Sequence, residues 1–387
     1  MKICVISDMH CKFLQNLEEG SDTLLTSNKP RRPVNQHPVA AFLNLIRKEK
    51  LKADILLCPG DLADKADEQG IISSWAFLEE IMRELNADSL FGVPGNHDIN
   101  SRKNYGKEPF AFIKSFHENF PVSDENMKIK FWESKYCLMV FKSSLFLLLN
   151  TVHDHTDGEK AKGSSILPET LESIRAELQH LKMSDFKHKV CVMHHHPVKH
   201  SNIQNWKDTD SVDRGDELMS ILSQYGFNIV IHGHKHQPRL IEHSSVPILA
   251  AGSFASYANL QGTGIQTMFH IIELQEGSRK GVINSWEYDI VNGWTQKDNK
   301  AFPPRIGFGA LLNISGTAQK INEIYECQGK IPLFYDAIVK VIPDIQYLIP
   351  DKLIELGNIL KEQYSLKPTP EYPLDPVKIS EYIKIGS

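Results

Sequence analysis

Five short polar segments of the sequence combine residues that could ligate metal ions. Each segment follows a short apolar run, and none of them offers a cysteine at a ligand position. They are Asp8-Met9-His10, Gly60-Asp61-Leu62-Ala63-Asp64, Gly95-Asn96-His97-Asp98, His195-His196-Pro197 and Gly233-His234-Lys235-His236. Mixed carboxylate and imidazole donors suit Mn, Fe, Zn or Ni, whereas the absence of thiolates argues against a structural zinc site.

The number of donors favours a pair of ions. Two Asp, one Asn and four His are too many ligands for one tetrahedral ion, but they fit two ions that share a carboxylate. Asp8 and Asp61 cancel only part of the charge of two divalent cations, so the remaining positive charge favours an anionic phosphoryl group. Paired metals roughly 3.5–4 Å apart clamp an in-line displacement and generate hydroxide near neutral pH.

Short apolar runs that alternate with helical patterns predict the elements that position these segments. We expect strands over residues 3–6, 54–57, 90–93, 190–193 and 229–231, and helices over residues 39–50, 71–85, 168–181 and 213–225. This alternation predicts a layered α/β core. The carboxyl ends of the strands would then present all five segments on one rim of a sheet. Side chains two apart in an extended segment point the same way, so Asp8 and His10 should reach one point.

Later parts of the chain differ in the kinds of secondary structure that the sequence predicts. A hairpin over 136–149 and strands over 246–249, 268–274 and 282–290 predict a second sheet packed on the first. After Pro303-Pro304, residues 333–360 look mostly helical, with breaks at Pro343 and Pro350. We therefore divide the chain into a catalytic domain, residues 1–300, and a C-terminal accessory region, residues 301–387. The accessory region carries no recognisable chemistry and could hold an oligomer contact or a protein partner.

The charge and the apolar runs of the sequence bear on whether the protein binds nucleic acid or a membrane. The net charge is −5, from 48 acidic and 43 basic side chains, so nothing predicts tight binding to nucleic acid. The longest apolar run, residues 145–149, is far shorter than the roughly 20 residues that cross a bilayer. The first apolar run is too short for the core of a signal peptide. We expect no membrane partner and a cytoplasmic location.

In this order, the five segments resemble the calcineurin-like metallophosphoesterase superfamily. Its pattern is D-x-H, G-D-x-x-D, G-N-H-[DE], H and G-H-x-H, and all five parts are complete here. The resemblance covers about residues 1–275 and implies a four-layered α/β/β/α sandwich, followed here by a mostly helical C-terminal extension. The His-His-Pro segment together with Gly-Asn-His-Asp looks most like phosphodiesterases that act on cyclic nucleotides or other small diesters.

The resemblance also implies a role for each site residue. One metal ion would be held by Asp8, His10, Asp61 and His236, and the other by Asp61, Asn96, His195 and His234. His97 is the expected general acid, Asp98 orients its ring, and Asp64 supports a ligand. His195 is preferred over its neighbours because the family ligand typically lies two residues before proline. Strand alternation then turns His194 and His196 away, and His196 could face the substrate.

The implied reaction is hydrolysis of a small, nucleotide-like phosphodiester by a metal-bridged hydroxide, with His97 as the acid. The implied cofactors are two divalent ions of Mn, Fe or Zn. A metal-dependent nuclease of the double-strand-break type is the alternative, although Cys11-Lys12 departs from the glycine-containing start of those enzymes. A binding scaffold without turnover is a third interpretation; scaffold members tend to lose ligands, and this sequence lacks none.

Overall fold

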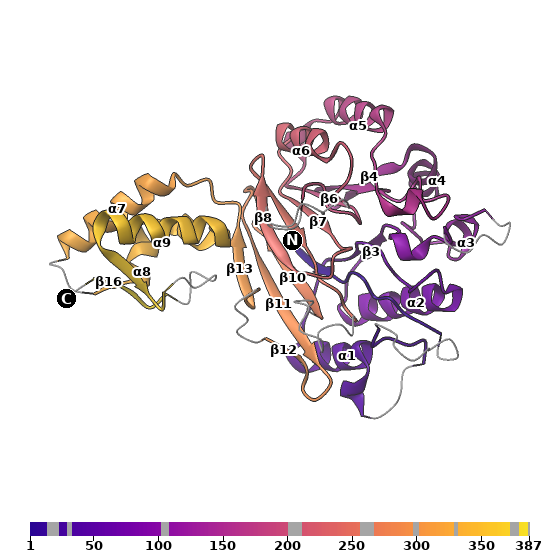
Figure 1. Ribbon diagram of the computed structural model, residues 1–387, viewed down its shortest axis with the longest axis horizontal. Helices are drawn as coiled ribbons and strands as arrows, with labels where there is room; N and C mark the ends of the chain where they lie inside the picture. The colour runs from indigo at the N-terminus through magenta and orange to yellow at the C-terminus, as the bar shows by residue number, and fades with distance from the viewer. Residues whose placement is uncertain are drawn as a thin grey trace.

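The computed structural model describes residues 1–13, 23–28, 33–101, 108–199, 211–255, 267–296, 302–328, 332–371 and 379–385. Two β-sheets lie face to face, with helices on the outer side of each, and a smaller C-terminal part projects from one end (Figure 1). This arrangement confirms the predicted four-layered α/β/β/α sandwich with a C-terminal extension.

The first sheet has parallel strands on one side and antiparallel strands on the other. In spatial order it contains β12 (Gly293–Thr295), β11 (Gly281–Asp289), β10 (Met268–Leu274), β1 (Lys2–Val5), β2 (Ile55–Cys58) and β3 (Ser89–Gly92), and β13 (Arg305–Phe308) also pairs with β11. β1, β2 and β3 run parallel, with Cys4 opposite Leu56 and Leu56 opposite Leu90. Their carboxyl ends therefore lie at the same edge.

The second sheet is built in the same way. Its order is β4 (Tyr136–Phe141), β5 (Ser144–Leu149), β6 (His188–Val192), β7 (Ile229–His232), β9 (Val246–Ala250) and β8 (Arg239–His243). β5, β6, β7 and β9 are parallel to one another. Three of the five ligand segments follow strands of the first sheet and two follow strands of the second. The prediction of one shared sheet rim was therefore wrong.

Strand alternation explains why the sheets are covered on both faces. Ile3 and Val5 of β1 lie in the core between the two sheets, together with Val190 and Val192 of β6. Cys4 faces the opposite way, toward the helices that cover the first sheet. Burial on both faces accounts for the continuous apolar runs of these strands.

The outer layers are two pairs of helices, with shorter helices at one end. α1 (Pro38–Glu49) and α2 (Glu68–Glu84) pack on the first sheet, and α5 (Pro168–His180) and α6 (Gly215–Gln224) pack on the second (Figure 1). The sequence predicted all four within a few residues. It did not predict α3 (Ala111–Ser115), α4 (Glu125–Ser134) or the short 3₁₀ helices η2 (Val34–Gln36), η3 (Asn96–Asp98), η4 (Lys160–Lys162) and η5 (Met183–Asp185).

The C-terminal extension has a hydrophobic core of its own. Its elements are α7 (Ile314–Cys327), β14 (Leu333–Phe334), α8 (Tyr335–Val341), η7 (Pro343–Tyr347), α9 (Pro350–Tyr364), β15 (Leu366–Thr369) and β16 (Glu381–Lys384). The predicted breaks at Pro343 and Pro350 are confirmed, since each proline begins a new helix. The division at residue 300 stays a prediction; β13, just beyond it, still belongs to the first sheet.

No helix among the described residues combines the length and the apolar character needed to cross a membrane. The cytoplasmic location stays a prediction. Cys4, Cys58, Cys137 and Cys191 are free and buried in the strands, as expected of core residues, and Cys11 is buried beside the site.

Candidate metal centre

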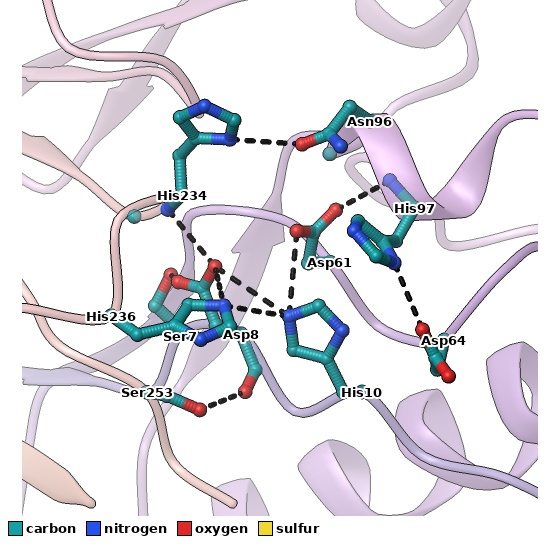
Figure 2. Close-up of polar contacts among 12 residues, drawn as sticks. Ser7, Asp8, His10, Asp61, Asp64, Asn96, His97, His234, His236 and Ser253 are labelled. Atoms are coloured by element: carbon teal, nitrogen blue, oxygen red, sulfur yellow. Dashed lines mark hydrogen bonds and ion pairs between the residues drawn. The ribbon is translucent and has the colours of Figure 1, made fainter. Parts of the chain in front are cut away.

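The ligand segments meet where the carboxyl ends of the two sheets come together. Asp8 and His10 follow β1, Asp61 follows β2, and Asn96 begins η3 just after β3. His234 and His236 enter from the turn after β7, on the other sheet. Figure 2 shows all six side chains turned toward a common centre, with Asp61 in the middle.

The first donor group comprises Asp8, His10, Asp61 and His236, and one ligand atom of each lies within 4.8 Å of all the others. The two imidazoles meet most closely, with His10 Nε2 2.9 Å from His236 Nε2. Carboxylate oxygens lie around this pair: Asp8 Oδ1 is 3.3 Å from His236 Nε2, and Asp61 Oδ2 is 3.5 Å from His10 Nε2. Two imidazoles and two carboxylates of this kind fit a divalent transition metal.

The second donor group lies on the other side of Asp61. Asn96 Oδ1 is 3.0 Å from His194 Nε2 and 2.9 Å from His234 Nδ1. The same Asp61 Oδ2 that faces His10 lies 3.3 Å from His194 Nε2. One carboxylate oxygen therefore faces both donor groups, which is the arrangement required for a shared ligand.

The structure differs from the sequence prediction in which histidine faces Asp61. His194, expected to point away, directs Nε2 at Asp61 and Asn96, while its Nδ1 donates to the carbonyl of Pro59 at 2.8 Å. His195 lies against Thr151 instead, with its Nδ1 3.0 Å from Thr151 Oγ1. Its ring also packs on that of His234, with centroids 4.4 Å apart. A ligand atom of His195 nevertheless lies within 4.8 Å of those of His194 and His234, so a metal-binding role for His195 stays a prediction.

The turns that carry the ligands have an unusual backbone. Asp8, His10, Asp61, His234 and His236 all have positive φ, between 46° and 78°. Such values are uncommon outside glycine and concentrate at functional sites. Asp8 and His10 therefore converge because the chain turns sharply, and the expectation of an extended segment was wrong.

Glycines in the motifs leave room for the carboxylates. A Cβ on Gly95 would lie 2.1 Å from Asp61 Oδ1, and one on Gly233 would lie 2.2 Å from Asp8 Oδ2. A methyl group at either position would push a ligand out of place. The glycines of G-N-H-D and G-H-x-H are thus explained by close approach of the backbone to a ligand.

Burial and charge put Asp61 and His10 in the forms that bind a cation, whereas His194, despite its burial, has its pKa raised to about 9 by the Asp61 and Asp8 carboxylates. Burial alone would raise the pKa of the Asp61 carboxyl, but His194 and His97 hold it well below its usual range. Burial, together with repulsion by His97, lowers the pKa of His10 to about 3. A carboxylate and a neutral imidazole are the protonation states that ligate metal.

The candidate general acid lies at the edge of this centre. The His97 ring packs edge-on against His10, with centroids 4.7 Å apart, and its Nδ1 donates to Asp64 Oδ1 at 3.0 Å (Figure 2). The backbone N–H of His97 donates to Asp61 Oδ1 at 2.7 Å. The ring is about a quarter exposed, the accessibility that a proton donor to substrate requires.

Asp98 bonds to the backbone of two loops at the site. Its carboxylate is buried and accepts hydrogen bonds from the backbone N–H groups of Gly95 and Ala63, at 2.8 and 3.1 Å. Burial and the nearby Asp61 raise the pKa of Asp98 to about 7. Asp98 therefore holds the loop, whereas Asp64 contacts His97, and the orienting role of Asp98 stays a prediction that this geometry does not favour.

His196 is buried against His232 and His234, with ring centroids 5.9 and 6.0 Å away. Its role as a substrate contact stays a prediction that this burial does not support.

Lys12 and His194 lie at the site although neither was predicted there. Lys12 stands in no recognisable motif, and the face of β6 that carries His194 becomes clear only from the packing of the two sheets. Val190 and Val192 face the other sheet, and His194 continues their alternation.

Comparisons with known proteins agree with this geometry. The pattern of the calcineurin-like phosphoesterases matches residues 1–238. The 3′,5′-cyclic adenosine monophosphate phosphodiesterase of Haemophilus influenzae is 22% identical over 252 residues, which cover 65% of this chain and 75% of that enzyme.

The solved structure of a purple acid phosphatase from yellow lupin seeds superposes with a TM-score of 0.51 at 13% identity. The likeness covers 80% of this chain but only 53% of the lupin enzyme, so it supports the fold alone. The match to the family spans more than half of the chain and includes every donor found around Asp61. The chain therefore belongs to the calcineurin-like phosphoesterases and is a phosphoric ester hydrolase.

Proposed function

We propose that this protein hydrolyses a small, nucleotide-like phosphodiester with the aid of two divalent cations held on either side of Asp61. The observation that carries the proposal is the position of Asp61 Oδ2, 3.5 Å from His10 Nε2 and 3.3 Å from His194 Nε2. One cation would be held by Asp8, His10, Asp61 and His236. The other would be held by Asp61, Asn96, His194 and His234, with His194 in place of His195.

The donor atoms support this assignment. They are carboxylate, amide and imidazole groups without thiolate, which suits Mn, Fe or Zn. When bound, such a pair supplies positive charge for the phosphoryl oxygens and a hydroxide near neutral pH. The asparagine adds a neutral ligand, so the site would remain positively charged and would favour an anionic substrate.

Protein side chains would complete the reaction. Asp64 accepts from Nδ1 of His97 and so fixes the tautomer and the orientation of the ring. Nε2 is then the ring nitrogen available to protonate the departing oxygen. His97 also lies beside His10, so it would be close to a phosphoryl group bound by the proposed cations.

Two adjoining cavities beside His97 support a small substrate. A cavity of about 140 Å³ is lined by His97 and Asn96, and it shares Ala66 and Asn100 with a larger cavity of about 320 Å³. The larger volume lies within the roughly 300–1,000 Å³ of small-molecule sites. The relative from Haemophilus influenzae is named for cyclic AMP, and a cyclic nucleotide or similar diester is the class that we propose.

The proposal is tested with the Mn²⁺-loaded protein on bis(p-nitrophenyl) phosphate, diphenyl phosphate and 3′,5′-cyclic AMP, beside p-nitrophenyl phosphate and single-stranded DNA. We expect the diesters to be hydrolysed faster than the monoester or the DNA. His97→Ala should lower kcat/KM for diphenyl phosphate by about 10²-fold, the lower end of what general acids contribute. His117→Ala, which removes a histidine paired with Glu79 away from the site, is the matched control.

Two results would contradict the proposal. One is a metal-loaded protein that hydrolyses no diester. The other is a His97→Ala variant that is as active as the His117→Ala control on diphenyl phosphate. DNA cleavage faster than hydrolysis of every small diester would select the nuclease instead.

A further inference from the structure

Lys12 places a buried ammonium group beside the candidate general acid. Its Nζ lies 2.9 Å from Asp64 Oδ2, and only 7% of its side chain is exposed. Lysine is rarely buried to this extent unless it is paired with a carboxylate. Lys12 belongs to neither donor group around Asp61. The pair therefore needs an explanation that the metal centre does not provide.

The two oxygens of Asp64 have different partners. Oδ1 accepts from His97 Nδ1 at 3.0 Å, the contact drawn in Figure 2, while Oδ2 accepts from Lys12 Nζ. An ammonium group, a carboxylate and an imidazole thus form a continuous chain from the protein interior to the site. Asp64 is held at both ends, which restricts rotation of its carboxylate.

The backbone on either side of this chain is fixed. The N–H of Lys12 donates to the carbonyl of Leu25 at 3.1 Å, and the carbonyl of Lys12 accepts from Ser27 N–H at 2.9 Å. The N–H of Asp64 donates to the carbonyl of Cys11 at 3.3 Å. The segments that carry Lys12 and Asp64 are therefore hydrogen-bonded to each other as well as through their side chains.

We propose that Lys12 is a positioning residue for phosphodiester hydrolysis, which holds Asp64 so that Asp64 orients His97 toward the leaving oxygen. The inference rests on the proposed function, because it needs His97 to act as the acid. Lys12 lies outside both donor groups, and in this role it acts only through Asp64. It is thus distinct from the ligands and from the acid itself.

Electrostatics supports this role. A partly buried carboxylate is costly unless it is paired and hydrogen-bonded. Burial would raise the pKa of Asp64, but the hydrogen bonds from His97 and Lys12 hold it well below its usual range. Without Lys12, Oδ2 would lose its charged partner, and the carboxylate could turn away from the imidazole.

Two substrates whose leaving groups differ in basicity can show whether Lys12 positions the acid or only stabilises the fold. Phenolate is more basic than p-nitrophenolate, so hydrolysis of diphenyl phosphate depends more on protonation of the departing oxygen than hydrolysis of bis(p-nitrophenyl) phosphate. Lys12→Met should lower kcat/KM for diphenyl phosphate about tenfold, as is usual for residues that orient a functional group. Its effect on bis(p-nitrophenyl) phosphate should be less than about twofold, because no strong acid is needed there.

The design remains informative if Lys12→Met is unstable. The ratio of the two rates within one preparation does not depend on the folded fraction, and Lys12→Gln, which keeps a hydrogen-bond donor without the charge, is measured beside it. Lys142→Met is the matched control, since Lys142 pairs with Asp54 and Asp88 on the surface. In a His97→Ala background, Lys12→Met should change neither rate further.

The outcomes distinguish this inference from the proposed function. If His97→Ala slows neither substrate, the proposed function fails. If His97→Ala selectively slows diphenyl phosphate while Lys12→Met slows both substrates equally or neither, the role of Lys12 alone is overturned. An undiminished effect of Lys12→Met in the His97→Ala background would also overturn it, because Lys12 would then act without the acid.

Discussion

At the end of β6, His194 and His195 are adjacent in sequence but face different surroundings. His194 Nε2 lies 3.3 Å from Asp61 Oδ2, whereas His195 Nδ1 lies 3.0 Å from Thr151 Oγ1. Both rings have Nδ1 held by a neighbour, the Pro59 carbonyl for His194 and Thr151 for His195, which leaves Nε2 of each as the nitrogen that could bind a metal. Nε2 of His194 also lies 3.0 Å from Asn96 Oδ1, so it faces two further donors. The geometry therefore favours His194 as the donor, and this choice can be tested directly.

We predict that His194→Ala removes one of two bound Mn²⁺ ions per chain and that His195→Ala removes neither. His194→Ala should also lower kcat/KM for bis(p-nitrophenyl) phosphate by at least about 100-fold, the upper end for residues that only support a ligand. The metal content of the purified variants by mass spectrometry and their steady-state rates measure the two effects. The reverse pattern, with metal lost from His195→Ala, would restore the prediction made from the sequence.

The sequence could predict the place of some residues in the site but not of others. Asp8, His10, Asp61, Asn96 and His236 follow from motif and spacing, because each follows directly from an identifiable strand end. His194 required knowledge of which face of β6 meets the other sheet, and hydrophobicity alone does not supply it when both faces are buried. The contact of Asp64 with His97 could not be predicted, because it joins two loops that lie far apart in the sequence.

At the scale of elements, the apolar runs predicted β1, β2, β6 and β7 within a few residues. They could not show that β6 and β7 belong to a different sheet from β1 and β2, since parallel strands of either sheet give the same pattern. They also could not show the positive φ at five ligands, a local conformation imposed by tertiary contacts.

Strand β10 contains a histidine that joins the two sheets. His270 Nε2 donates to the carbonyl of Ala251, just after β9, at 2.6 Å, and Ser285 of β11 lies 2.8 Å from its Nδ1. Burial lowers the pKa of His270 to about 4. The folded protein thus keeps this ring neutral while the unfolded chain takes up a proton near the ordinary value, so folding is disfavoured as pH falls.

From pH 7 to pH 5, this single group should remove about 2 kcal/mol of unfolding free energy, since a pKa difference between states sets the slope. We predict that His270→Gln loses less stability over this range than the wild-type protein. Urea unfolding of the metal-free proteins at both pH values measures the difference. His180→Gln, at the exposed end of α5, is the control, and equal pH dependence in all three proteins would be inconsistent with a buried neutral His270.

At the scale of the whole molecule, the C-terminal extension is anchored to the catalytic sheets. Ile349, just before α9, is buried in the core between the two sheets. Lys280 Nζ lies 2.7 Å from Asp344 Oδ1, and the N–H of Ala310 donates to the carbonyl of Tyr347 at 3.1 Å. The extension thus contributes the Ile349 side chain to the core between the two sheets, although none of its described residues contributes a donor to the metal centre.

We predict that Ile349→Ala lowers the unfolding free energy by about 2–5 kcal/mol, the usual loss for removing a buried isoleucine side chain. Leu311→Ala is the matched control, because 66% of Leu311 is exposed. Thermal and urea unfolding compare the two variants, and kcat/KM of the folded proteins should not change. Equal stability of both variants would show that Ile349 does not anchor the extension.

The most direct test of the account is anomalous diffraction from crystals soaked in Mn²⁺. We expect two peaks of anomalous density roughly 3.5–4 Å apart, the usual spacing of paired catalytic metals. One peak should lie among Asp8, His10 and His236, the other among Asn96, His194 and His234, with Asp61 between them. A single peak, or two peaks that are not both next to Asp61, would contradict the proposed pair of cations.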